Sequence, residues 1–157
     1  MIYEITTTIP TLVITSLKLS KDDDGSIVDP MFLKRILGSL MYLSGTRLDI
    51  MYGVSMISIF MESPKESHWK ESKRILRYVS GTKDLGTMYS TSKNFKLIGY
   101  HDSNNGGNID DRKSTYGYTF HFGIGVVSWA SNKQPILTLF SVEAEYVAAT
   151  SVTRQAV

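Results

Sequence analysis

The spacing of the apolar residues changes near residue 84, and this change constrains the fold more than any other feature of the sequence. Before it, apolar residues recur with the period of a helix: between Pro30 and Leu43 they stand at i, i+3, i+4 and i+7, as Leu33, Ile36, Leu37 and Leu40. After it, β-branched and aromatic residues gather in short runs, which is typical of strands. The sequence therefore predicts a mostly helical part at 1–84 and a β-rich part at 85–157.

Three helices are expected in the first part. Asp29 followed by Pro30 is a start signal for the first helix, because proline fits the first helical turn. The second helix is expected from Asp49 to Met61. The third is expected to begin at "SPKE", residues 63–66, which has the pattern of a capping box with proline just inside the helix, and to end at Ser80-Gly81.

The second part is expected to be a three-stranded antiparallel meander followed by one helix. Strand-like runs lie at 85–90, 95–101, 116–122 and 125–131, and residues 123–125 have the composition of a tight hairpin turn. The helix is expected to follow Ser141 as its N-cap. A meander and one helix normally need further elements to close a core, so the sequence predicts an incomplete domain of the α+β or α/β class.

The composition leaves the function open but excludes some chemistry. Seventeen Lys and Arg against fifteen Asp and Glu give a net charge of +2, so nucleic-acid binding would have to rest on a local patch. The absence of cysteine excludes thiolate metal sites and a cysteine nucleophile. The apolar stretch "IPTLVITSL" is too short to span a bilayer, and Glu4 stands where a secretory signal carries positive charge. We therefore expect no membrane span and no targeting signal, with residence in the cytoplasm or nucleus.

Asp102 is the first candidate for chemistry. It follows the strand-like run "LIGYH", and the end of a strand is a common place for a functional carboxylate. The Asp-Ser-Asn-Asn-Gly sequence also fits an ordinary turn, in which the Asp side chain accepts hydrogen bonds from the backbone. His101 is not expected to share a site with Asp102, because neighbouring residues of a strand point to opposite faces.

Glu145 is the second candidate. Glu143 and Glu145 both lie in the first turn of the expected helix, where acids ordinarily complement the helix dipole. Two residues correspond to about 200° of rotation, so both carboxylates cannot face one site. The small residues Ala144 and Ala148 lie near Glu145 and allow close packing on a sheet, which makes Glu145 the better candidate for a sheet-facing acid.

A basic stripe on the expected third helix is the third candidate. Its members are spaced i, i+3, i+4 and i+7: Lys70, Lys73, Arg74 and Arg77. Such a stripe can bind nucleic-acid phosphates, but it is also the ordinary composition of a solvated helix face. His68 and His121 have no partner at metal-ligand spacing and are expected to be structural or surface residues.

Five blocks of sequence, taken together, resemble one known family. They are, in order, "GSLMYLSGTRLDI" (38–50), "SPKESHWKESKRILRYVSGT" (63–82), "LIGYHDSNNGGNIDDRKSTYGYTFHFG" (97–123), "VSWASNKQ" (127–134) and "EAEYVAAT" (143–150). This order is similar to the copia-type retrotransposon polyprotein (Gag-Pol), at the join of its reverse transcriptase and its ribonuclease H (RNase H) domain. The resemblance covers roughly residues 10–157.

The resemblance implies a role for each part. Residues 1–84 would correspond to the thumb and connection region at the C-terminal end of the reverse transcriptase, and residues 85–157 to the start of an RNase H-like fold. In that fold, acidic residues hold two Mg²⁺ (or Mn²⁺) ions that cleave RNA in an RNA–DNA hybrid. By position, Asp102 matches the first of these metal-binding acids and Glu145 the second.

The same resemblance implies limits on activity. The family's other metal-binding acids lie beyond Val157, so Asp102 and Glu145 are expected to be vestigial and the chain inactive on its own. The family's Asp-Ser-Asp-Trp-Ala-Gly reads Asp-Ser-Asn-Asn-Gly-Gly at 102–107, Leu48 replaces a proline, and Phe140 replaces a small hydroxyl residue.

The alternative function is a non-catalytic nucleic-acid-binding or interaction module that uses the basic stripe. The expected partners are an RNA–DNA hybrid or other duplex, the rest of the polyprotein, and a second copy of the chain. The second copy would pair with the open edge of the strand at 97–101.

Overall fold

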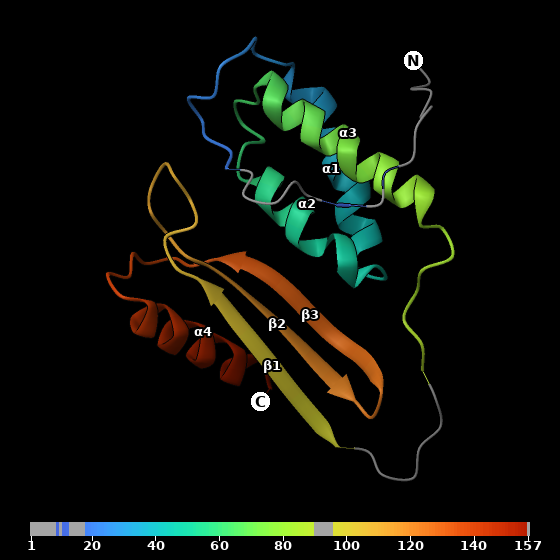
Figure 1. Ribbon diagram of the computed structural model, residues 1–157, viewed down its shortest axis with the longest axis vertical. Coiled ribbons are helices and arrows are strands. Elements are labelled where there is room, and N and C mark those ends of the chain that lie inside the picture. Colours follow the sequence, from blue (N-terminus) through green and yellow to red (C-terminus); the bar gives the residue numbers. More distant parts are fainter. Residues whose placement is uncertain (1–8, 10, 13–17, 90–95, 157) are drawn as a thin grey trace. The chain divides into compact units, whose positions relative to one another are not determined.

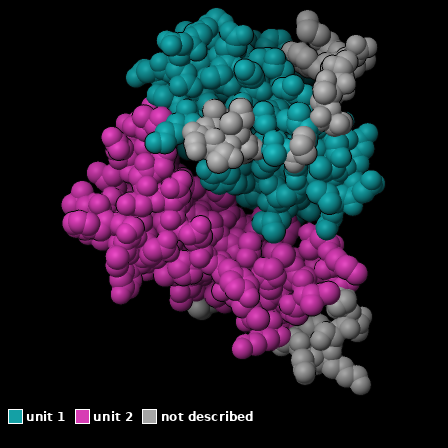
Figure 2. All heavy atoms as spheres, viewed as in Figure 1, with its two compact units in different colours: residues 1–86 teal, residues 87–157 magenta. Residues whose placement is uncertain are grey.

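The computed structural model describes residues 9, 11–12, 18–89 and 96–156 and shows an α+β protein (Figure 1). Its helices are α1 (Pro30–Ser44), the 3-10 helix η1 (Leu48–Ile50), α2 (Met51–Ser58), α3 (Glu66–Gly81) and α4 (Ser141–Ala156). Its strands are β1 (Leu97–Asn104), β2 (Thr115–Phe122) and β3 (Gly125–Lys133). The chain divides into two compact units, residues 1–86 and 87–157, which Figure 2 colours separately.

The first helix, α1, forms where its sequence predicts. The Met31 N–H donates to Asp29 Oδ1 at 2.9 Å, and Pro30 occupies the first turn. This cap satisfies one of the backbone donors that a helix start leaves without a partner. The apolar stripe of α1 is buried against α2 and α3, and the core of the first unit comprises Leu19, Leu33, Leu37, Leu40, Ile50, Val54, Ile57, Phe60 and Ile75.

The second and third helices differ in extent from their predictions. The predicted second helix, from Asp49 to Met61, is too long. The structure divides this segment into η1 and α2, and α2 ends at Ser58. The predicted capping box at 63–66 is wrong: α3 begins at Glu66, with Lys65 as its N-cap. The residues before α3 instead pair with residues 26–28, where the Val28 N–H donates to Pro64 O at 2.9 Å.

His68 is a structural residue of the first unit, as expected. Its Nδ1 accepts the Lys65 N–H at 2.9 Å, and its Nε2 lies 3.1 Å from Ser20 O. The ring is fully buried and stacks on Phe60 with the two ring centroids 4.0 Å apart. Both ring nitrogens therefore satisfy backbone groups, and His68 ties the start of α3 to the loop that contains Ser20.

A buried arginine fixes the end of α3. Arg47 donates to both carboxylate oxygens of Asp49 at 2.8 and 2.6 Å, and to the carbonyl and hydroxyl oxygens of Thr82 at 2.9 and 2.7 Å. The hydrogen bonds from Arg47 lower the pKa of the Asp49 carboxyl below its ordinary value, although partial burial opposes this. Burial raises the pKa of the Tyr78 hydroxyl, and the neighbouring Asp49 carboxylate adds to this shift. The sequence analysis did not predict these contacts of Arg47.

The second unit contains a three-stranded antiparallel sheet in the order β1-β2-β3. In the register of the strands, Leu97 is opposite Phe122 and Thr115 is opposite Lys133, with an irregularity between Phe120 and His121. The predicted hairpin turn between β2 and β3 is confirmed, and Gly123 adopts a φ of 63°, a left-handed conformation that favours glycine in tight hairpin turns. The predicted meander is therefore present.

Two strand boundaries correct the sequence prediction. Residues 85–89 are not a strand, while residue 90 of the same run lies outside the described residues. β1 continues to Asn104, so Asp102 does not end the strand but lies within it, opposite Gly117. Pairing with β2 carries the extended backbone past the point where the Asp-Ser-Asn-Asn composition suggested a turn.

The last helix, α4, packs mainly against β1. Ser141 is its first residue rather than its N-cap, which corrects the sequence prediction. The backbone N–H groups of Leu139 and Phe140 donate instead to Glu143 Oε2, at 2.9 and 3.4 Å. The carboxylate of Glu143 thus reaches back to the helix start, as the third residue of a capping box does. None of the helices within the described residues is long and apolar enough to cross a membrane.

Candidate functional site

The face of the sheet that α4 covers contains the candidate site. Ala144, Ala148 and Val152 recur at i, i+4 and i+8 on α4 and are buried. Phe120 of β2 is also buried, and its ring lies over Gly99 of β1: a Cβ atom on Gly99 would be 2.7 Å from Phe120 Cε1. Small residues on the helix and on the strand thus let α4 and β1 come close together.

A buried glutamine connects α4 to the sheet. The Gln134 Nε2–H donates to the Ala144 carbonyl at 2.8 Å and lies 3.5 Å from Ser103 Oγ, while its backbone N–H donates to Ser114 O at 2.8 Å. Gln134 is only 1% exposed. These contacts fix the first turns of α4 relative to β1, and so determine which β1 residue meets Glu145.

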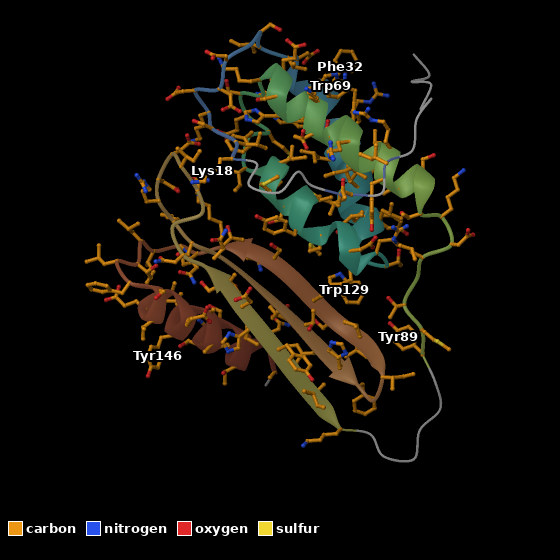
Figure 3. All side chains as sticks on the ribbon, viewed as in Figure 1. Lys18, Phe32, Trp69, Tyr89, Trp129 and Tyr146 are labelled. Carbon is orange, nitrogen blue, oxygen red and sulfur yellow. The ribbon has the colours of Figure 1, made fainter. Side chains whose placement is uncertain are left out.

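Glu145 meets His101. Glu145 Oε2 lies 3.6 Å from His101 Nδ1, and the two side chains are 44% and 35% exposed. They line a pocket of about 310 Å³ together with Ser141, Val142, Tyr146 and Ala149. Figure 3 labels Tyr146 on α4, where its ring is largely exposed. The expected sheet-facing acid therefore does contact β1, but through an imidazole rather than a second carboxylate.

Asp102 lies on the other face of β1. His101 and Ser103 both face α4, and successive side chains of a strand point to opposite faces, so Asp102 between them points away from α4. The Asp102 carboxylate is exposed and accepts the Ser103 N–H at 2.9 Å. The structure therefore does not bring Asp102 and Glu145 together.

The carboxylate and imidazole groups of the described residues do not form the two-metal site that the resemblance implies. Two divalent ions close together need several carboxylate oxygens that converge on them. Over the described ranges, 18–89 and 96–156 included, no group of three or more His, Asp or Glu side chains could hold a metal ion. The residues present do not fit a two-magnesium site, and the metal roles of Asp102 and Glu145 remain a prediction.

The loop after β1 is a compact turn. The Gly106 N–H donates to Ser114 Oγ at 3.1 Å, and Ser114 Oγ lies 3.3 Å from Asn105 Oδ1. Ser114 itself is fully buried. At the two positions where the family pattern has a carboxylate and a large aromatic side chain, Asn104 is the last residue of β1 and Asn105 lies in the turn that connects β1 to β2.

The basic stripe lies on α3, and most of its side chains already have contacts. Lys70 is exposed, whereas Lys73 Nζ lies 5.6 Å from the centre of the Trp69 ring. Arg74 donates to Thr11 Oγ1 at 3.0 Å, and the Arg77 Nε–H donates to Lys73 O at 3.4 Å. Glu71, an acidic residue of the same helix, is buried. Nucleic-acid binding by the stripe remains a prediction.

His101 is the residue that sequence reasoning missed at this site. The alternation of side chains correctly separated His101 from Asp102, but it did not say which of the two would face the helix. Gly99, two residues before His101, was the available signal. A residue without a side chain in the middle of a strand often marks a close approach of another element, and residues 99 and 101 share one face.

Comparison with known proteins finds relatives among transposon polyproteins. The chain is 39% identical over 132 residues to the retrovirus-related Pol polyprotein from transposon RE2 of Arabidopsis thaliana, a match that covers 84% of this chain and 9% of the polyprotein. It is 41% identical over 129 residues to the Pol polyprotein from transposon RE1 of the same plant, with coverage of 82% and 9%.

A third relative is of similar extent to the chain itself. The chain is 39% identical over 122 residues to the secreted RxLR effector protein 161 of Plasmopara viticola, a match that covers 77% of this chain and 86% of that protein. No protein-family model matches the chain. No solved structure matches it either.

Proposed function

Because the chain belongs to the retrovirus-related Pol polyproteins of copia-type transposons, we propose that residues 97–156 form the first part of an RNase H-like domain. Such a domain hydrolyses RNA in RNA–DNA hybrids. The chain spans only about 9% of the length of the Pol polyproteins that it matches, so this activity is proposed for the longer polyprotein. We further propose that the helical unit, residues 1–86, is the C-terminal end of the adjoining reverse transcriptase.

The observation that carries this proposal is the position of Glu145. An antiparallel meander is followed by a helix that packs against the first strand of the sheet through Ala144 and Ala148. This packing presents the Glu145 carboxylate 3.6 Å from a β1 side chain. A helix that delivers an acid to the first strand is the arrangement that the resemblance implies.

The same geometry supports the proposal that this chain does not cleave RNA on its own. Asp102 and Glu145 lie on opposite faces of β1, and RNA hydrolysis of the RNase H kind requires divalent ions held by converging carboxylates. Magnesium would supply the activation of water and the stabilisation of the leaving oxygen in the complete domain. The residues of this chain contribute the sheet, the helix and two acidic positions.

A chimeric protein tests the proposal. The chain would be extended with the segment that follows the matched region in the RE1 polyprotein, and both the chain and the chimera would be assayed for cleavage of an RNA–DNA hybrid with Mg²⁺ or Mn²⁺. We expect no cleavage by the chain, and cleavage by the chimera that Glu145→Gln abolishes. Loss of cleavage in Asp102→Asn as well would mean that Asp102 reaches the α4 face of β1 once the domain is complete.

The control is the complete RE1 segment under the same conditions. If that segment cleaves the hybrid while a folded chimera does not, the RNase H-like assignment of residues 97–156 is contradicted. Cleavage by the unextended chain, abolished by both substitutions, would overturn the conclusion that the chain is inactive.

A further inference from the structure

We propose that the Asn105–Gly106 pair is a site of spontaneous covalent modification, at which Asn105 loses its side-chain amide through a cyclic imide and Ser114 acts as the proton shuttle. The proposal rests on three groups in the turn after β1: the Asn105 amide, the Gly106 backbone nitrogen and the Ser114 hydroxyl. It concerns the covalent structure of the chain and does not depend on the RNase H-like assignment.

The sequence already distinguishes Asn105 from the other asparagines. The backbone nitrogen of the residue after an asparagine can attack the side-chain amide carbon, because the bond closes a small ring. A Cβ on that next residue hinders the attack, and glycine has none. Asn105 alone is followed by glycine among the five asparagines of the sequence, which are Asn94, Asn104, Asn105, Asn108 and Asn132.

A single hydroxyl contacts both groups that have to react. The Gly106 N–H donates to Ser114 Oγ at 3.1 Å, and the Ser114 hydroxyl donates to Asn105 Oδ1 at 3.3 Å. Thr138 Oγ1 lies 3.1 Å from Ser114 Oγ and can donate to it, which leaves the Ser114 proton for Asn105. Ser114 is fully buried, so bulk water does not compete for its hydroxyl.

This arrangement lets the hydroxyl act as acid and base in the same step. As the Gly106 nitrogen bonds to Asn105 Cγ, its proton passes to Ser114 Oγ and the Ser114 proton passes to Asn105 Oδ1. Asn105 Cγ then carries a hydroxyl and an amino group. The C=O bond re-forms as the Cγ–Nδ2 bond breaks, and the hydroxyl proton leaves with the nitrogen as ammonia.

The imide that remains is opened by water at either of its carbonyl carbons. Opening at one carbon gives aspartate, and opening at the other gives isoaspartate, in which the backbone runs through the former side chain. The overall reaction consumes one water and releases one ammonia, with no oxidant or reductant. Asn105 is exposed and Gly106 is partly exposed, so water can reach the imide and ammonia can leave.

Asn108, in the same loop, provides the contrast. Its Oδ1 accepts the backbone N–H groups of Asp110 and Asp111 at 2.9 and 3.2 Å. The next residue is Ile109, whose branched Cβ hinders attack by its backbone nitrogen. We therefore expect Asn108 to stay intact under conditions that convert Asn105, which makes it an internal control.

Peptide mapping by mass spectrometry tests the proposal on the full chain, incubated at neutral pH and sampled over time. We expect aspartate and isoaspartate to accumulate at position 105. Each conversion adds one negative charge to a chain of net charge +2, so isoelectric focusing separates the product. The folded chain should react at least about tenfold faster than the chain in concentrated urea, where Ser114 is not held beside the pair.

Ser114→Ala removes the shuttle. It should slow conversion of the folded chain at least about tenfold and leave the rate in urea unchanged. Ser128→Ala is the matched control, because it removes a hydroxyl from β3, opposite Phe120 and away from the turn, and should change neither rate. Circular dichroism checks that each variant is folded, and the comparison of folded and unfolded wild type stands whether or not Ser114→Ala folds.

Two results would overturn the proposal. If the folded wild type keeps Asn105 intact while the chain in urea converts it, the turn protects the pair instead of promoting its reaction. If a folded Ser114→Ala chain converts Asn105 as fast as the wild type, Ser114 is not the shuttle. Neither result bears on the chimera experiment, so the two proposals can fail separately.

Discussion

At the scale of single residues, Gly99 decides how closely α4 approaches the sheet. We expect Gly99→Ala to destabilise the second unit by about 1–3 kcal/mol, because the new Cβ would lie 2.7 Å from the Phe120 ring, which α4 keeps buried. Urea denaturation measures the change. Gly86→Ala is the control, since a Cβ at Gly86 meets nothing within 4 Å. Equal effects of the two substitutions would contradict the close-packing role of Gly99.

Phe140 offers a change in the opposite direction. It precedes α4 and is 66% exposed, and the Glu143 carboxylate already accepts its backbone N–H. Phe140→Ser should complete a capping box and raise the free energy of unfolding by about 0.5–1 kcal/mol. The same denaturation experiment measures this. Leu139→Ser, one residue earlier and also exposed, removes a similar apolar side chain without creating a cap and should give no gain.

At the scale of elements, the Arg47–Asp49 pair joins η1 to the end of α3, and its contribution should depend on pH. The pKa of Asp49 is lower in the folded chain than in the unfolded chain. The stabilisation that ionised Asp49 gives the folded chain is therefore complete above the ordinary carboxyl pKa, near pH 4. It is lost as the pH falls through the lowered pKa of Asp49 in the folded chain. We expect Asp49→Asn to be less stable at pH 7 and to lose less stability on acidification.

Thermal unfolding between pH 7 and pH 2.5 measures this difference in slope. The control is Asp24→Asn, which removes an exposed carboxylate from the same unit and should leave the pH dependence of the wild type in place. If the stability of Asp49→Asn falls with decreasing pH as steeply as that of the wild type, carboxylates other than Asp49 cause the acid sensitivity.

The elements also differ in how far local sequence determines them. The start of α1 was predictable because Asp29 and Pro30 act on the adjacent turn. The start of α3 was not, since the bridge between Ile27 and Lys65 joins residues far apart in the sequence and takes "SPKE" out of the helix. Likewise, β1 passes Asp102 because β2 supplies its backbone partners.

The candidate site shows the same division. The small residues around Glu145 correctly indicated that this acid faces the sheet, because they lie on the same helix. The face of β1 that meets α4 depends instead on Phe120, Gly99 and Gln134, which come from three different segments. Alternation along β1 alone could therefore not decide between His101 and Asp102 as the partner of Glu145.

At the scale of the whole molecule, the open edge of β1 leads us to predict self-association. Among the described residues β1 pairs with β2 alone, and seven of its eight residues are exposed. An exposed edge without proline or lysine leaves backbone N–H and C=O groups free to pair with another strand. Two copies of β1 can pair with each other, because an antiparallel pair of identical strands is self-complementary.

We therefore expect the chain to self-associate reversibly with rising concentration, as measured by sedimentation velocity. Ile98→Lys places a charge on the exposed edge and should weaken association at least about tenfold, because a second strand would have to bury that charge. Ile124→Lys makes the same change in the hairpin turn, away from the β1 edge, and should have no effect. If both substitutions weaken association equally, the contact is a general apolar one rather than pairing of β1. If the wild type remains monomeric throughout, the open edge is protected in solution and the prediction fails.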